Sequence, residues 1–179
     1  NCSTGTKDLG PLMEEVANYP NVSFGDIRSS KDWQLPSAII VVAADGTKTT
    51  FVDDSKKTLP PINVSNIKDS DFCHIMYLNQ IDSINENTIK EIKKHIPIVS
   101  ADLFSTSYDK KTANRIFSVL CSINYLFASE NEIIHLASFL YDNKPSLQDC
   151  LNGLNKAFKT TFIIHGNNCS YVAHLEKWS

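Results

Sequence analysis

The sequence predicts an α/β protein with a mostly parallel, Rossmann-type β-sheet flanked by helices and a small β-hairpin ahead of it. From residue 71 onward, short apolar runs alternate with amphipathic runs of helical period. Repeated strand–helix–strand units require right-handed crossovers and a mostly parallel sheet. The stretch "SAIIVVAADGTKTTFVDD" (37–54) instead shows two β-rich runs joined through Asp45-Gly46. Because Asp-Gly favours the positive φ angles of a tight turn, this stretch predicts a hairpin.

The segments before the sheet and its first unit follow in chain order. Gly10-Pro11 ahead of "LMEEVANY" predicts a short helix with proline in its first turn, and "NVSFGDI" predicts a short strand. "DFCHIMYL" is a continuous apolar run, typical of a strand covered on both faces. "SINENTIKEIKKH" opens with Ser83 and Glu86, which predict a helix that begins with a capping box.

The remaining units repeat this alternation. "IPIVSAD", "INYLFAS" and "TTFIIHG" are predicted strands, and "CSYVAHL" is predicted to pair antiparallel with the last of them. The predicted helices are "KKTANRIFSVL", "SENEIIHLASFL" and "SLQDCLNGLNKAF". The second of these opens with the capping pair Ser129 and Glu132. The third carries an apolar stripe, formed by Leu147, Leu151, Leu154 and Phe158.

Length, charge and cysteine content narrow the function classes. A chain of 179 residues predicts a single domain. The net charge of −3 and the lack of a basic block argue against a nucleic-acid partner. No run approaches the roughly 18 apolar residues of a membrane span, and no signal peptide is visible. Five cysteines without a Cys-x-x-Cys pair favour a reduced, cytoplasmic location.

Ligands of open parallel sheets bind beyond the carboxyl ends of the strands, so the residues that follow each predicted strand are candidates. Asn79 offers an amide for a substrate hydroxyl, or it is only a loop residue. Asp102 offers a carboxylate for a metal, a sugar hydroxyl or a helix N-terminus. Glu132 either closes a capping box with Ser129 or also holds a hydrated Mg²⁺. Gly166 opens the last turn.

A metal or Cys-His reading of the last turn is disfavoured. His165, Cys169 and His174 match no common zinc spacing. Strand alternation would also point Cys169 and His174 to opposite faces.

In their order, these features resemble the ribokinase-like (PfkB) carbohydrate kinases over nearly the whole chain. The hairpin is similar to the β lid of that family, and "DFCHIMYL" resembles the strand whose substrate contact falls on Asn79. "PIVSAD" resembles the strand that ends in an aspartate, here Asp102. "INYLFASENEIIHL" resembles the segment with the N-x-x-E motif, and "TTFIIHGNNCSYV" resembles the T-x-G-x-x-G nucleotide segment.

The resemblance implies an ATP-dependent kinase that phosphorylates a hydroxyl of a carbohydrate or related small molecule. It implies that Asn79 and Asp102 bind the sugar substrate and that Glu132 binds Mg²⁺. The implied ATP contacts are Ser129, Gly166, Asn167 and Asn168. The expected organisation is one incomplete ribokinase-like domain over 1–179, with the lid at about 22–58 inserted before the sheet segment 70–179.

The apolar run "AIIVV" in the lid is expected to expose one face and to meet a ligand or a second copy of the chain, as in a homodimer.

The sequence also departs from the family pattern. Ser129 stands for the Asn of N-x-x-E, and Phe104 for the Asn expected after the aspartate. Ile164 and Cys169 stand for the Thr and the last Gly of T-x-G-x-x-G. The family's glycine-rich sugar segment and its G-A-G-D motif, with the catalytic Asp and anion hole, are expected outside the 179 residues. No catalytic residue is therefore assigned, and the alternative is a degenerate, non-catalytic module for binding or assembly.

Overall fold

The computed structural model describes residues 2–5, 9–21, 27–30, 38–46, 48–52, 64, 70–141, 145–166 and 169–174. The chain forms two compact units, Asn1–Leu59 and Pro60–Ser179, and each is described by itself.

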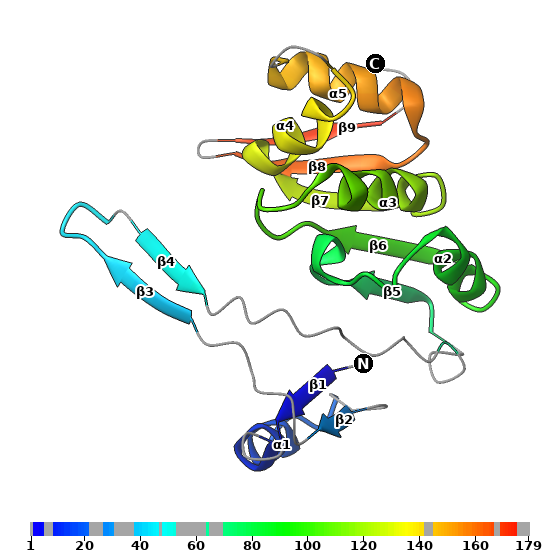
Figure 1. Ribbon diagram of the computed structural model, residues 1–179. Helices are drawn as coiled ribbons and strands as arrows, with labels where there is room; N and C mark the ends of the chain where they lie inside the picture. The colour runs from blue at the N-terminus through cyan, green and yellow to red at the C-terminus, as the bar shows by residue number, and fades with distance from the viewer. Residues whose placement is uncertain are drawn as a thin grey trace. The chain divides into compact units, whose positions relative to one another are not determined.

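The described residues of the first unit form two separate strand pairs and one helix (Figure 1). Strand β1 (Cys2–Gly5) pairs in parallel with β2 (Ile27–Ser30), and helix α1 (Leu9–Ala17) lies between them in the chain. The predicted helix is confirmed, and Pro11 lies in its first turn. The strand predicted for "NVSFGDI" overlaps β2 only at Ile27, and residues 22–26 lie outside the described residues.

The second strand pair of this unit is the predicted hairpin. Strand β3 (Ala38–Val42) pairs antiparallel with β4 (Lys48–Val52). Gly46 adopts φ +84°, and its N–H donates to the carbonyl of Ala43 at 2.9 Å. Four consecutive apolar side chains of β3 are 51–67% exposed: Ile39, Ile40, Val41 and Val42. Because neighbouring residues of a strand point to opposite faces, apolar side chains are exposed on both faces and not on one.

The second unit is a five-stranded sheet in the order β5-β6-β7-β8-β9 (Figure 1). Its strands are β5 (Phe72–Ile75), β6 (Ile98–Asp102), β7 (Tyr125–Ser129), β8 (Thr161–His165) and β9 (Ser170–Ala173). The first four run parallel, and β9 pairs antiparallel with β8, as predicted. Its helices are α2 (Glu86–Lys93), α3 (Lys110–Leu120), α4 (Glu130–Ser138) and α5 (Leu147–Ala157).

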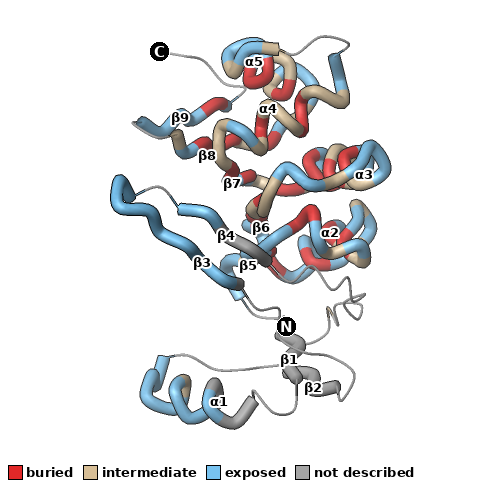
Figure 2. Tube along the Cα trace, turned by 60° about the vertical axis from the view of Figure 1, so that its left-hand side comes forward, coloured by how far each residue is buried: buried red, intermediate tan, exposed pale blue. Residues whose placement is uncertain are grey.

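The helices of this unit lie on one side of the sheet (Figure 2). The strand order never reverses, and right-handed crossovers that advance in one direction place every connecting helix on the same face. The sheet side chains under the helices are buried: Val99, Ala101, Leu126, Ala128, Phe162 and Ile164. On the other side, five apolar side chains remain 36–58% exposed: Phe72, Ile98, Tyr125, Phe127 and Val172. We call these five residues the open face.

The strand β5 is shorter than predicted. It ends at Ile75, because Tyr77 adopts a left-handed φ of 56° that no β-strand accommodates, and a 3₁₀ turn (Leu78–Gln80) follows. Within the described sheet β5 is an edge strand, and Phe72 is half exposed. The prediction of a strand covered on both faces was therefore wrong.

The helix starts follow capping chemistry. The predicted box of Ser129 and Glu132 forms at α4, and Ser146 and Asp149 form another at α5. The box predicted for Ser83 and Glu86 was wrong. The cap of α2 is Asn85, whose Oδ1 accepts the backbone N–H groups of the second and third helical residues at 3.0 and 3.2 Å.

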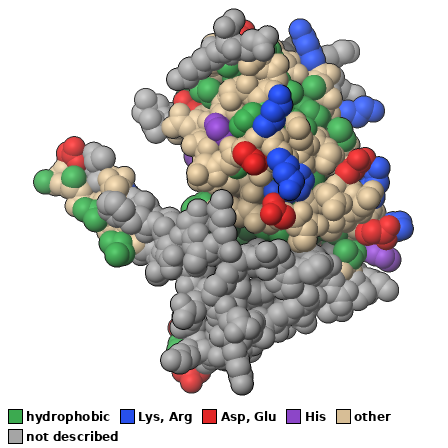
Figure 3. All heavy atoms as spheres, viewed as in Figure 1, with side chains coloured by type: hydrophobic (Ala, Val, Ile, Leu, Met, Phe, Trp, Pro, Cys, Tyr) green, Lys and Arg blue, Asp and Glu red, His purple; other side chains and the backbone are tan. Residues whose placement is uncertain are grey.

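The visible face of the second unit carries acidic and basic side chains interspersed, without a basic stripe (Figure 3). No helix among the described residues has the length and apolar character that crossing a membrane requires.

Candidate functional site

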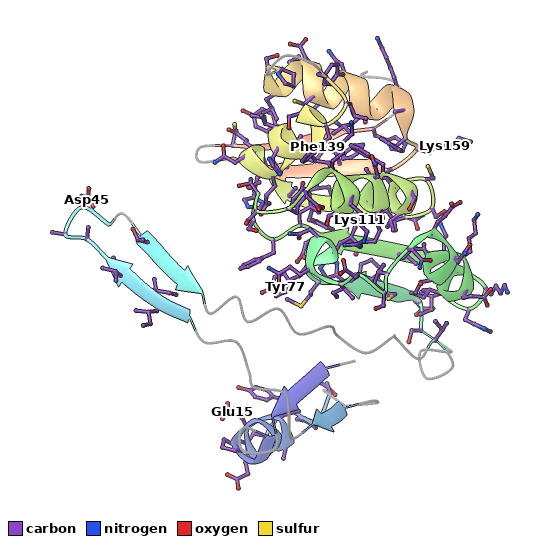
Figure 4. The ribbon with its side chains drawn as sticks, in the orientation of Figure 1. Glu15, Asp45, Tyr77, Lys111, Phe139 and Lys159 are labelled. Carbon is purple, nitrogen blue, oxygen red and sulfur yellow. The ribbon has the colours of Figure 1, made fainter. Side chains whose placement is uncertain are left out.

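The candidate site lies where β5, β6, β7 and β8 end, since the carboxyl ends of parallel strands meet at one edge of the sheet. Asn79 lies in the turn after β5, Asp102 ends β6, and Ser129 ends β7. Gly166 directly follows β8. Tyr77 marks this edge in Figure 4, and Lys159, just before β8, lies at the opposite edge.

Asn79 is buried, and both polar atoms of its side chain are hydrogen-bonded. Its Nδ2 donates to the carbonyl of Phe104 at 2.6 Å, and its Oδ1 accepts the N–H of Phe104 at 2.8 Å. Arg115 anchors the same turn from α3, because its guanidinium donates to the carbonyls of Leu78, Asn79 and Ile84 at 3.0–3.2 Å. The Asn79 amide thus ties the turn after β5 to the loop after β6.

Asp102 holds the loop after β5. Its Oδ1 accepts the backbone N–H of Tyr77, and its Oδ2 lies 3.5 Å from Nε2 of His74. The other ring nitrogen of His74 is 2.6 Å from Oγ of Ser100. The side chain of Asp102 remains 25% exposed. Of the two predicted sugar-binding side chains, Asp102 is therefore the one that solvent, and hence a ligand, can reach.

Glu132 holds the loop after β6 in a similar way. Its Oε1 accepts the N–H of Ser105 at 2.8 Å, and its Oε2 accepts the N–H of Ser129 at 2.7 Å. Ser129 completes the capping box, because its Oγ accepts the N–H of Glu132 at 3.4 Å. Ser105 is left-handed with φ 73°, as Tyr77 is with φ 56°. Each carboxylate thus fixes a strained loop residue that follows the preceding strand of the sheet.

Each oxygen of Glu132 accepts one backbone hydrogen bond and keeps a second lone pair. Because Mg²⁺ usually binds one or two carboxylates and keeps several waters, this carboxylate is compatible with a hydrated Mg²⁺. Among the described residues, no three His, Cys, Asp or Glu side chains cluster closely enough to hold a metal ion. The metal role of Glu132 stays a prediction.

The turn after β8 is closed by its own backbone. The N–H of Gly166 donates to the carbonyl of Cys169 at 2.8 Å. A Cβ added to Gly166 would lie 2.1 Å from Oε1 of Glu130, so this glycine makes room for a carboxylate. Asn167 and Asn168 lie outside the described residues.

Sequence reasoning missed three residues of this edge. His74 was hidden inside an apolar run, although a histidine in a strand that leads to the candidate edge is a usable signal. Arg115 and Glu130 lie on helix faces that the periodicity assigns to solvent, and their contacts run to loops distant in sequence. Nothing in the local pattern indicates those contacts.

A hollow of about 300 Å³ lies at the amino edge of the sheet, away from the predicted residues. Its walls are formed by Lys93, Cys121, Ser122, Ile123, Asn124, Tyr125, Lys159, Thr161 and His174. Its place in the fold separates it from the candidate site.

No protein-family model matches this sequence, and no curated protein matches it at the level of sequence. Solved structures, by contrast, match its fold. Arabidopsis thaliana ribokinase, complexed with ribose and ATP, superposes with a TM-score of 0.68 at 16% identity. Fructokinase from Xylella fastidiosa superposes with a TM-score of 0.66 at 15% identity. Fructokinase from Vibrio cholerae, bound to fructose, ADP and calcium, gives 0.66 at 15%.

These superpositions cover 95–98% of this chain but only 56–59% of the three kinases. The chain thus spans less than two thirds of their length. At such low identity the likeness concerns the fold. The second unit has the mostly parallel sheet with flanking helices that these kinases share, and the chain has a ribokinase-like carbohydrate kinase fold.

Proposed function

We propose that the chain is the central part of an ATP-dependent sugar kinase of the PfkB family. Such an enzyme transfers the γ-phosphoryl group of ATP to a hydroxyl of a carbohydrate or related small molecule. The observation that carries the proposal is the ribokinase-like sheet, which brings Asn79, Asp102, Ser129 and Gly166 to one carboxyl edge. The structural neighbours include one bound to ribose and ATP and one bound to fructose and ADP.

The roles follow from exposure and from the order along the edge. The partly exposed carboxylate of Asp102 is proposed to accept a hydrogen bond from a sugar hydroxyl. The buried Asn79 is proposed to hold the loops beside it in place. Ser129, Gly166, Asn167 and Asn168 are proposed for the nucleotide side. ATP and Mg²⁺ are the proposed cofactors, and a cytoplasmic location is part of the same proposal.

A second candidate is a non-catalytic, kinase-like module for binding or assembly. The observation that favours it is that the candidate groups already form internal hydrogen bonds. The amide of Asn79, both oxygens of Glu132 and the N–H of Gly166 all serve internal hydrogen bonds. All three groups hold the loops in place, and the two donors among them, the Asn79 amide and the Gly166 N–H, therefore offer little to a phosphate.

Catalysis of phosphoryl transfer rests on positioning and on charge stabilisation at the transferred group. The family segments that supply this positioning and this charge stabilisation are expected outside the 179 residues. We therefore expect the 179-residue chain to bind Mg-ATP with a dissociation constant in the millimolar range or weaker, roughly −4 kcal/mol. We expect no ATP-dependent turnover of sugars by this chain.

The test combines calorimetry with Mg-ATP and a coupled ADP-release assay over a panel that includes ribose and fructose. The same assays are run on the protein expressed from its complete reading frame. Turnover by that protein, lost in Asp102→Ala, supports the kinase. Absence of turnover with intact folding supports the non-catalytic module. Micromolar nucleotide binding by the 179 residues alone would show that the site is misplaced.

A further inference from the structure

The turn after β8 contains a carboxylate that the family resemblance does not account for. Glu130, the first residue of α4, places Oε1 2.1 Å and Cδ 2.9 Å from the point that a Cβ of Gly166 would occupy. The carboxylate therefore fills the side-chain space that the glycine leaves free. A conformational reason for this glycine is lacking, because its φ is not in the positive range.

The described surroundings of Glu130 do not neutralise its charge. Among the described residues, no lysine or arginine forms an ion pair with it. Its interaction partner is Tyr171 on β9, whose hydroxyl also interacts with Cys169. The Cys169 side chain and, to a smaller extent, the Glu130 carboxylate raise the pKa of Tyr171 to about 12. Within the described part of the chain, this carboxylate therefore lacks a cationic partner.

The N–H of Gly166 does not offset this charge. This N–H is already donated to the carbonyl of Cys169, so it does not face a ligand. A phosphate that approaches Gly166 meets a carboxylate within a few ångströms, and like charges at such distances repel strongly near a protein surface.

We propose that Glu130 sets the charge selectivity of this turn, excluding anionic phosphate from Gly166 and admitting neutral or cationic groups. This inference rests on the proposed function, because it concerns the same nucleotide-side turn. It means that a triphosphate gains little from Gly166 itself and that the charge of Glu130 limits nucleotide affinity.

The test compares the unchanged chain with Glu130→Gln and with Glu91→Gln. The control removes one charge from an exposed side chain of α2, which pairs with Lys94. The probe is inorganic tripolyphosphate, followed by the backbone amide resonance of Gly166 and by calorimetry. We expect Glu130→Gln to bind it about tenfold more tightly, with a larger gain at low salt, because screening weakens the repulsion. Equal affinity for all three proteins overturns the inference.

A second measurement needs no ligand. In a double-mutant cycle of Gly166→Ala and Glu130→Ala, the new methyl group collides with the carboxylate only when Glu130 is present. Gly166→Ala should therefore lower the denaturation midpoint less in the Glu130→Ala background. In an ultraviolet titration, the Tyr171 transition, identified by its loss in Tyr171→Phe, should move to lower pH in Glu130→Gln. Additive midpoints with an unmoved transition place the carboxylate elsewhere and overturn the inference.

The two proposals can fail separately. If the full-length protein turns over a sugar but Glu130→Gln does not change tripolyphosphate binding, the kinase proposal stands and the proposed role of Glu130 is wrong. If Glu130→Gln binds tripolyphosphate more tightly but the full-length protein turns over no sugar, the proposed role of Glu130 stands and the kinase proposal is wrong.

Discussion

The polar side chains of the carboxyl edge form hydrogen bonds with the loops on either side. Asn79, Asp102 and Glu132 each bind a backbone group of a neighbouring loop, at Phe104, Tyr77 and Ser105 respectively. Such contacts hold the loops in a fixed conformation before any ligand arrives, and preorganised loops are what a binding site on strand ends requires.

Replacing Asn79 tests this role. Asn79→Ala removes two hydrogen bonds and leaves the N–H and carbonyl of Phe104 without partners, at about 3 kcal/mol in the free energy of unfolding. Asn79→Asp keeps the acceptor for the N–H but sets an oxygen against the carbonyl, so it should also destabilise. Urea denaturation measures both. A loss below about 0.5 kcal/mol for Asn79→Ala would mean that the amide is free for a substrate.

At this scale the sequence located the residues but not their partners. The positions after each apolar run predicted Asn79, Asp102, Ser129 and Gly166 at one edge, because strand alternation with helices fixes where the strands end. The partners of Asn79 and Asp102 are backbone groups 25 residues away in the chain, and Glu132 binds one that is 27 residues away. A backbone N–H has the same chemistry in every residue except proline, so no sequence pattern reveals which one a carboxylate binds.

Among the elements, the start of α2 shows how close alternatives compete. Ser83 and Glu86 match a capping box, but Asn85 lies directly before the helix and accepts two of its free N–H groups. Ser83 is left with a buried hydroxyl that has no hydrogen-bond partner. Asn is at least as good a cap as Ser, and the residue nearest to the helix takes the role.

The two substitutions at this helix start should therefore differ. Asn85→Ala is expected to lower stability by about 1 kcal/mol, because two helix N–H groups lose their acceptor. Ser83→Ala should be neutral or slightly stabilising, because it removes a buried hydroxyl without a partner. Thermal unfolding of both variants decides the matter, and a reversed order would restore the Ser83 capping box.

The hairpin β3–β4 predicts self-association. Four exposed apolar residues in succession form a larger apolar surface than a two-stranded ribbon keeps in water. We expect the chain to dimerise through this hairpin, and Ile40→Lys with Val42→Lys to shift it to monomers with unchanged far-ultraviolet circular dichroism. Analytical ultracentrifugation measures the masses. A chain that sediments as a monomer before substitution excludes the dimer.

Strands and helices were the most predictable level of the fold. The hairpin, the parallel units and the antiparallel last strand all follow from periodicity and turn residues. The end of β5 was not predictable, because Met76 and Tyr77 continue the apolar run, yet Tyr77 turns left-handed to reach Asp102. The end of β5 is thus set by a hydrogen bond to Asp102 on β6.

For the molecule as a whole, the open face is the main departure from a finished α/β fold. Parallel sheets occur almost only with both faces covered, because their strands are apolar on both sides. The chain spans only 57% of the ribokinase that it superposes on. We therefore expect the open face to bind hydrophobic ligands and to promote aggregation of the 179-residue chain.

Val172→Lys tests this expectation. Val172 is 58% exposed on the edge strand β9, where a lysine can reach water without disturbing the core. The substitution should lower the fluorescence of a bound hydrophobic dye and reduce aggregation. Leu140→Lys is the matched control, because Leu140 is 45% exposed after α4 and lies outside the open face. Equal effects of the two lysine substitutions on dye binding and aggregation would contradict a specific role of the open face.

The uninterrupted strand order also bears on how the protein is made. In the described sheet, each strand from β6 to β9 pairs with the strand that precedes it in the chain. A newly synthesised strand therefore finds its first partner already made. Each parallel pairing spans a single strand–helix unit, and domains tend to fold from the N-terminus during synthesis. The sheet can therefore grow by one strand and one helix at a time, in step with translation.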